Sequence, residues 1–312
     1  MERWILTAVW ATLPLTAGTA IADATADWST APQIVAAVLC WAAWAVAFLA
    51  IVVPRPVGLT AARAVAPWFA VLAGVIAVFG DTDTAAAVVA VTATLVAAVL
   101  VARPPLAFAA ANAAAYGDEA RSPLRTPPAL FLGPLPAVRL LLGAAIVTGP
   151  LLLADEQWLT GASAVAIGAP VAYFAARALH GLSTRWAVLV PAGFVVVDRL
   201  TLSDPVLFLR ERIVSLRAIG PRPPTDDDAL DLRLGASLGS VGLTLDRPAE
   251  VFRALRSRKG AAAVRATEVW VAVVDANGLL RSAAERRIPV VAEVGTARPQ
   301  AATPPPTSSS PS

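Results

Sequence analysis

Residues that could do chemistry are few in this chain, and most of them lie in one connecting segment. Two carboxylates and two guanidinium groups occur close together there, in Asp118, Glu119, Arg121 and Arg125. Carboxylates beside arginines could serve acid–base or phosphoryl chemistry, and they could equally bind a charged partner. Because no further motif fixes their geometry, we interpret the segment as an interaction loop and rank an enzyme third among the possible functions.

The other catalytic and metal-binding patterns are incomplete. The run 235–239 (GASLG) fits the nucleophile elbow of hydrolases, but it lies between predicted strands, and the only histidine, His180, precedes it. We interpret this run as a glycine-rich hairpin turn. One histidine and one cysteine cannot make a zinc site, and no phosphate-binding loop occurs. The sequence therefore predicts no catalytic residue, no cofactor and no metal.

A basic cluster follows the start of a predicted helix at Asp246. It consists of Arg253, Arg256, Arg258 and Lys259. Such a face beside a membrane attracts anionic lipid head groups. Nucleic acid is disfavoured as a partner, because no aromatic stacking pattern accompanies the cluster. A solvated helix face is the plainer alternative.

The segments that position the interaction loop and the basic cluster are mainly predicted membrane spans. The chain is 57% hydrophobic and 15% charged, with a mean hydropathy of +0.67, which indicates an integral membrane protein. Apolar runs of about 20 residues predict six spans, the first of which could instead be a cleaved signal peptide. These spans are Trp4–Ala22, Ile34–Val53, Ala64–Gly80, Thr84–Ala102, Pro136–Ala154 and Trp158–Ala176.

Charge sorts the connections between these spans into two groups. The acidic connections carry Asp23, Asp27, Asp81, Asp83, Asp155 and Glu156. The basic ones carry Arg3, Arg55, Arg63, Arg103, Arg121, Arg125 and Arg139. Since arginine-bearing connections belong on the cytoplasmic side, we predict three helical hairpins in a bacterial plasma membrane, with both termini in the cytoplasm. Arg63 is placed in the loop 54–63 and Arg139 at the interface, so no span should carry an ionisable residue within it.

Two glycine–proline pairs could interrupt the last two spans. Gly149 and Pro150 lie in the fifth span, and Gly168 and Pro170 lie in the sixth. Broken helices of this kind are one mark of a transporter site. Proline kinks are also tolerated for packing alone, so transport ranks second.

Beyond His180 the apolar runs become short and alternating, which predicts strands. We expect a hairpin at Trp186–Asp198, strands at Val206–Leu209 and Ile213–Leu216, a strand pair of 230–234 with 241–245, a helix at Asp246–Gly260, a strand at Glu268–Asp275 and a helix at Leu279–Ile288. This order resembles a pleckstrin-homology-like barrel. The predicted fold is thus an α-helical membrane domain (1–180), a small cytoplasmic α+β domain (181–288) and a disordered Pro/Ser/Thr tail (289–312).

Two segments resemble known sequences. The runs 116–128 (YGDEARSPLRTPP) and 185–193 (RWAVLVPAG) look like segments of uncharacterised actinobacterial integral membrane proteins, which are similar in overall plan and imply no activity. We therefore predict a non-catalytic membrane protein that binds partners or lipid through its cytoplasmic domain, for example in envelope assembly. The expected partners are the lipid bilayer, anionic lipid head groups and a membrane or envelope protein. A small-solute transporter or channel that uses the last two spans is the alternative.

Overall fold

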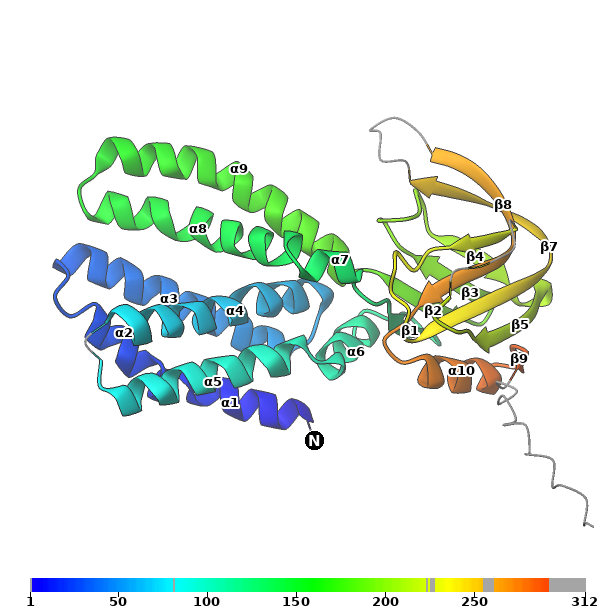
Figure 1. Ribbon diagram of the computed structural model, residues 1–312, viewed down its shortest axis with the longest axis horizontal. Helices are drawn as coiled ribbons and strands as arrows, with labels where there is room; N and C mark the ends of the chain where they lie inside the picture. The colour runs from blue at the N-terminus through cyan, green and yellow to red at the C-terminus, as the bar shows by residue number, and fades with distance from the viewer. Residues whose placement is uncertain (1, 81, 223, 225–227, 255–260, 292–312) are drawn as a thin grey trace, which may run out of the picture.

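The computed structural model describes residues 2–80, 82–222, 224, 228–254 and 261–291. Within these residues a bundle of long helices occupies one end of an elongated molecule, and a β-rich unit occupies the other end (Figure 1).

Six stretches of helix in the described residues are long and apolar enough to cross a membrane, with lengths of 19 to 26 residues. They are α1 (Glu2–Thr16) with α2 (Gly18–Ala24), α3 (Thr30–Val52), α4 (Pro56–Phe79), α5 (Thr84–Ala102), α8 (Pro134–Ala154) and α9 (Trp158–Ser183). The six predicted spans are thereby confirmed as helices, and the architecture is that of a multi-pass membrane protein.

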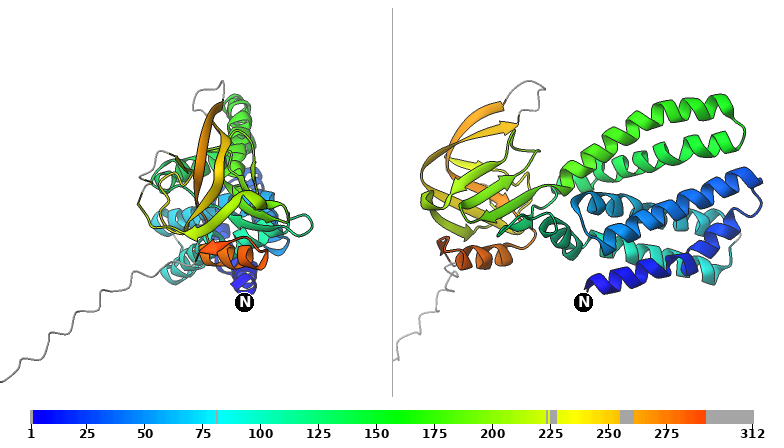
Figure 2. Two further views of the ribbon diagram at one scale, coloured as in Figure 1. Left: turned by 90° about the vertical axis from the view of Figure 1, so that its right-hand side faces the viewer. Right: turned by 180° about the vertical axis from the view of Figure 1, so that it is seen from behind.

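The connections between these helices alternate between the two ends of the bundle. The start of α1, the α3–α4 connection and the exit of α5 lie at the end that faces the β-rich unit, whereas the α2–α3, α4–α5 and α8–α9 connections lie at the far end (Figure 2). A hydrogen bond of 3.3 Å from Arg3 Nη2 to the Val52 carbonyl oxygen ties two elements of the near end together. The predicted sorting of charge therefore corresponds to two ends separated in space.

Two helices begin earlier than predicted. α4 starts at Pro56, a residue suited to the first helical turn, so Arg63 lies about two turns inside the helix and not in a loop. α8 starts at Pro134, which gives the fifth span 21 residues and places Arg139 inside it. The prediction that no span carries an ionisable residue is wrong at these two positions and also in α9, which continues past the predicted end at Ala176 through Arg177 and His180.

The predicted breaks in the last two spans are absent. α8 runs without interruption through Gly149 and Pro150, and α9 runs likewise through Gly168 and Pro170. The glycines instead let the two helices approach closely. A Cβ on Gly149 would lie 2.5 Å from the side chain of Val165, and a Cβ on Gly168 would lie 2.6 Å from a carbonyl oxygen of α8. These residues are packing positions in a transmembrane hairpin.

The β-rich unit contains two open sheets. The first has the antiparallel order β1 (Ala120–Pro123), β2 (Trp186–Val190), β3 (Gly193–Val197) and β4 (Val206–Leu209). The second has the order β6 (Ala229–Asp231), β8 (Ala261–Ala272), β7 (Ser240–Ala254), β5 (Ile213–Ala218) and β9 (Val290–Val291). A short 3₁₀ turn, η1 (Arg210–Arg212), separates β4 from β5. The described strands do not close into the barrel that their order suggested.

Buried apolar residues from both sheets form the core of this unit. Phe194, Leu216 and Leu243 are almost fully buried, and Leu279 and Ala283 of α10 (Ala276–Glu285) pack against the same cluster. The Asp275 carboxylate accepts a hydrogen bond from the Gly278 N–H at the start of α10, as expected of an N-cap. The predicted last helix and the hairpin of β2 and β3 are confirmed.

Two predictions for the second sheet are wrong. β6 pairs in parallel with β8, Leu230 lying opposite Val269, and does not pair with the strand at 241–245. Residues 246–254 continue β7 and do not form a helix, because residues 249–254 pair with residues 261–266 of β8 after a bulge. The rest of the predicted helix, 255–260, lies outside the described residues. The cap and proline at 246–248 are local helix signals, and the pairing with the following strand overrides them.

β1 is the element that the sequence did not reveal. It lies between the fourth and fifth predicted spans, in the segment interpreted as a loop, yet it pairs with β2 along its whole length, from Ala120 opposite Leu189 to Pro123 opposite Trp186. The β-rich unit thus includes residues far outside the expected range 181–288.

Candidate functional site

A cavity of about 480 Å³ lies where the helical bundle meets the β-rich unit. Its walls come from α4, α8, α9, the short helices α6 (Pro104–Asn112) and α7 (Pro128–Phe131), the chain after β1, and the loop before β7. Four arginines line it, Arg63, Arg125, Arg139 and Arg185, and none of the described lining residues is acidic. The cavity is therefore strongly electropositive.

Arg185 is a structural part of the wall. Its Nε and Nη2 donate to the two carboxylate oxygens of Asp198 at 2.7 Å, and both side chains are almost completely buried. Its Nη1 donates to the carbonyl oxygen of Arg125 at 2.9 Å. Asp198 also accepts from the backbone N–H of Leu200 and from the Thr201 hydroxyl. Paired and hydrogen-bonded in this way, Arg185 and Asp198 compensate each other's charge.

Arg125 is held in a similar way by backbone oxygens. Its Nε and Nη2 donate to the carbonyl oxygens of Val273 and Val274 at 3.1 and 3.2 Å, which ties the chain after β1 to the end of β8. Gly239 makes room for this contact. It has a φ of +67°, and a Cβ there would collide with the Val273 carbonyl oxygen and lie 3.2 Å from Arg125 Nε.

The glycine-rich run 235–239 is thereby explained as a turn that leaves space for an arginine. It is not a nucleophile elbow, and it does not close a hairpin either, because its flanking strands β6 and β7 do not pair with each other. Ala236, Ser237 and Leu238 from this run line the cavity.

Arg63 and Arg139 differ from the other two arginines. Each has a buried Nε with no hydrogen-bond partner among the described residues. Arg63 Nη2 lies 3.5 Å from the Ala102 carbonyl oxygen, at the limit of a hydrogen bond. Within the described part of the chain neither side chain forms an ion pair. Two guanidinium groups thus point unpaired donors into a protein interior.

The helices hold these two arginines close to each other. Trp68 of α4 donates from Nε1 to the Arg139 carbonyl oxygen at 2.8 Å, and Gly143, one turn further along α8, has no side chain to obstruct the indole ring. A second cavity of about 30 Å³ is lined by both Arg63 and Arg139. Beside it, the Thr60 hydroxyl and His180 Nδ1 are 3.1 Å apart and join α4 to α9.

The residues of the predicted interaction loop are largely engaged within the molecule. Asp118 pairs at 3.1 Å with Arg286, the residue that follows α10. Arg121 pairs with Glu119 at 2.9 Å, and its guanidinium group lies 4.7 Å from the Trp186 ring centre. The hydrogen bond from Arg121 holds the pKa of Glu119 below its usual range, against the opposing effect of burial. Of the four predicted residues, only Arg125 lines the cavity.

The edge of β1 is also occupied. The Asn112 side chain at the end of α6 donates to the Arg121 carbonyl oxygen and accepts from the Arg121 N–H, both at 3.0 Å. One side-chain amide thus takes the place of a neighbouring strand and joins the helical bundle to the β-rich unit.

The predicted basic face is not brought to this cavity. Arg253 is exposed on β7, where it lies opposite Ala262, and no helix forms there. Arg256, Arg258 and Lys259 lie outside the described residues.

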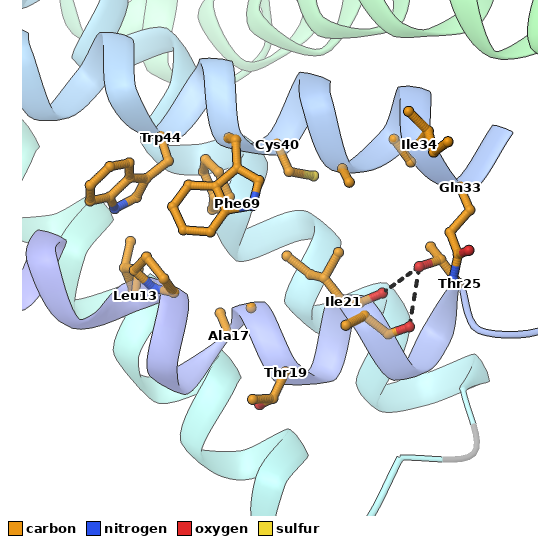
Figure 3. Close-up of a pocket in the computed structure, with 16 residues that line it drawn as sticks. Leu13, Ala17, Thr19, Ile21, Thr25, Gln33, Ile34, Cys40, Trp44 and Phe69 are labelled. Carbon is orange, nitrogen blue, oxygen red and sulfur yellow. Dashed lines mark hydrogen bonds between the residues drawn. The ribbon is translucent and has the colours of Figure 1, made fainter. Parts of the chain in front are cut away.

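A further opening of about 560 Å³ lies in the bundle between α1, α2 and α3 (Figure 3). Its lining is almost entirely apolar, and Leu13, Trp44 and Phe69 are among the residues that form it. The Thr25 hydroxyl is satisfied locally by the carbonyl oxygens of Ile21 and Ala22. This opening offers dispersion contacts and no charged group.

Comparisons of the chain with protein-family models, with curated proteins and with solved structures give no match. The chemistry of the site has to be inferred from its own side chains. Arg63 and Arg139 were missed as site residues because each was assigned to the end of a span. Pro56, which suits the first turn of a helix, was the signal that could have extended α4 past Arg63.

Proposed function

We propose that this protein is a non-catalytic integral membrane protein that binds an anionic ligand or partner where its helices meet a cytoplasmic β-rich unit. The observation that carries the proposal is the composition of the cavity. Four guanidinium groups and three hydroxyl groups, those of Thr126, Ser183 and Ser237, line it together with apolar side chains. Such a set suits the binding of negative charge.

The sorting of charge along the bundle supports the orientation. The end that carries the β-rich unit bears Arg3, Arg55, Arg63, Arg103 and Arg139, and the far end bears Asp23, Asp27, Asp83, Asp155 and Glu156. Arginine-rich ends of membrane proteins face the cytoplasm. We therefore propose that the β-rich unit and the start of α1 lie in the cytoplasm of a bacterial cell.

Exposed apolar side chains support the binding of a further membrane or envelope component. Phe131 and Leu132, beside the cavity, are 57% and 92% exposed, and Leu207 and Leu209 are exposed on β4, an edge strand of the first sheet. Edge strands with free backbone groups are common sites of strand addition by a partner.

Solute transport is the second candidate function, and one observation favours it. Arg63 and Arg139 lie inside candidate spans, and ionisable residues at such positions often line a transport path. The continuous helices α8 and α9 favour the binding function over transport, because the discontinuous helices typical of transporter sites do not occur in this hairpin.

The function is tested by purifying the full chain in a mild native detergent and identifying retained components by mass spectrometry. We expect a stoichiometric protein partner or a retained anionic lipid. Reconstituted protein should show no solute flux across vesicles, and a clear flux would replace this proposal with the transport function.

The orientation is tested by cysteine labelling in intact cells, in a Cys40→Ser background. Asp155→Cys should react with an impermeant reagent from outside, and Arg55→Cys should react only after permeabilisation. The reverse pattern would invert the proposed topology.

A further inference from the structure

We propose that the cavity between the helices and the sheets is a binding site for a phosphate group, recognised jointly by Arg63 and Arg139. This inference rests on the proposed function and names the chemistry of its ligand.

The first argument is the imbalance of charge. Arg63 and Arg139 enter the cavity from two different helices, each with a buried Nε that lacks an acceptor. A buried charged donor without a partner is costly, and in native proteins such a group usually marks a bound ion, ligand or water. Since no described lining residue is acidic, a bound anion is the ligand that would compensate both charges.

The second argument is the shape of the donor set. A guanidinium group presents a planar fork of N–H donors that fits two oxygens of a phosphate. Two such forks from α4 and α8 can share the oxygens of one tetrahedral group, and the hydroxyls of Thr126, Ser183 and Ser237 line the same space. A volume of about 480 Å³ is also sufficient for a phosphate with its attached head group.

The other two arginines of the cavity, Arg125 and Arg185, hold its wall in place, and their donors are already used within the chain. Arg185 is saturated by Asp198 and the Arg125 carbonyl oxygen, and Arg125 donates to two carbonyl oxygens of the chain after β8. Arg125 adds positive potential to the cavity, the charge of Arg185 is compensated by Asp198, and the positions of both are held by the β-rich unit.

The surroundings favour a lipid as the source of the phosphate. Leu59, Phe131, Leu135 and Leu182 form an apolar part of the wall. Arg63 and Arg139 lie within about two turns of the ends of candidate spans, which is the depth of the head groups. Basic pockets between transmembrane helices on the cytoplasmic side bind the head groups of anionic lipids.

The test uses the full chain, purified in detergent and stripped of lipid, and titrated with phosphatidylglycerol, phosphatidylcholine or inorganic phosphate. Native mass spectrometry measures binding of the lipids, and a phosphate titration of the unfolding temperature measures the free ion. Arg63→Gln with Arg139→Gln should weaken phosphatidylglycerol binding by about tenfold or more, because charge-assisted hydrogen bonds are lost.

A matched control removes the same charge from the same end of the bundle. Arg55 and Arg177 are exposed and do not line the cavity, so Arg55→Gln with Arg177→Gln should keep affinity within about twofold. Arg63→Lys with Arg139→Lys keeps the charge but loses the fork, so it should bind with intermediate affinity. An unchanged unfolding temperature without ligand shows that each variant is folded.

Preferential binding of phosphatidylglycerol over phosphatidylcholine would identify a lipid source. Stabilisation by inorganic phosphate without a preference between the lipids would identify a soluble phosphate, and the site would stand in both cases. The proposal is overturned if the glutamine pair binds every probe as the unmodified chain does, or if the control pair loses as much affinity. A stoichiometric protein partner found in the native purification would then leave the proposed function standing without this site.

Discussion

In the β-rich unit Arg185 and Arg233 are each buried against a carboxylate, whereas Arg63 and Arg139 in the helical bundle form no ion pair with any of the described residues. Arg233 forms a two-point ion pair with Asp231, donates to the carbonyl oxygens of Gly220 and Arg222, and lies 4.6 Å from the Trp270 ring centre. The same type of side chain is thus fully satisfied in one half and left with free donors in the other.

This difference separates two roles for a buried arginine. A pair completed within the chain keeps the fold intact, because removing one partner leaves an uncompensated charge in a low-dielectric interior. A guanidinium group whose hydrogen bonds are not all made within the chain contributes little to the stability of the fold, and its free donors remain available to a bound anion. The following variants test this distinction, starting with the largest expected effect.

Asp198→Asn should destabilise the β-rich unit by about 3–5 kcal/mol, because it leaves the charge of Arg185 buried without its counter-charge. Thermal unfolding followed by near-ultraviolet circular dichroism measures the loss. Asp204→Asn is the control, since this carboxylate is exposed and contacts only the hydroxyl of Ser203, and it should change stability by less than about 0.5 kcal/mol. Equal stability of the two variants would contradict the structural role of Arg185.

Gly143→Ala should cost about 1–3 kcal/mol by overpacking, because the new methyl group would collide with the indole ring of Trp68. The same change should displace Arg139, whose carbonyl oxygen accepts from Trp68, and weaken anion binding. Tryptophan fluorescence and unfolding in detergent report both effects. Gly74→Ala in α4 meets open space and should be neutral or slightly stabilising.

Asp231→Asn should remove an acid-sensitive part of the stability. Burial tends to raise the pKa of Asp231, but the hydrogen bonds and charge of Arg233 outweigh it and hold that pKa below its usual value. The ion pair therefore stabilises the fold above about pH 4, and this contribution is lost as pH falls further, through the lowered pKa. Unfolding temperatures at pH 7, 4 and 3 should fall less steeply for the variant. Parallel curves for the two proteins would disprove this linkage.

Arg63→Gln with Arg139→Gln should have the smallest effect on stability. In the absence of ligand the pair should change the free energy of unfolding by less than about 1 kcal/mol, or raise it, because two like charges leave a half-buried site. The comparison with Asp198→Asn is made in the same lipid-free detergent. A loss comparable to that of Asp198→Asn would show that these arginines are structural after all.

The membrane half was predictable because its main determinant is local. An apolar run of sufficient length must become a helix in a membrane, and Thr84–Ala102 was located to the residue. The start of α4 was misplaced because Arg63 was assigned to a loop, whereas the start of α8 was predicted to within two residues. Arg63 and Arg139 can lie inside helices since they face a cavity, which no local pattern reveals.

The β-rich unit was predictable only where its contacts are local. The hairpin of β2 and β3 has a two-residue turn, and it was located correctly. The parallel pairing of β6 with β8 depends on partners far away in the chain. The continuation of β7 through Pro248 depends on pairing with the following strand, β8, which outweighs the helix signals at 246–248. The candidate site could not be predicted from the sequence, because it combines residues that are far apart in the chain, from α4, α8, β2 and the loop before β7.

The position of β1 has a consequence for how the protein is made. β1 is synthesised before α8 and α9, but its partner β2 follows them, so the first sheet cannot close until the last helical hairpin is complete. Pairing across such a distance is slow, because the entropy of loop closure opposes it. Closure of the first sheet therefore occurs only after the last transmembrane hairpin, α8 and α9, has been synthesised. Chains stalled before Trp186 should expose Ala120–Pro123 to protease, and full-length chains should protect it.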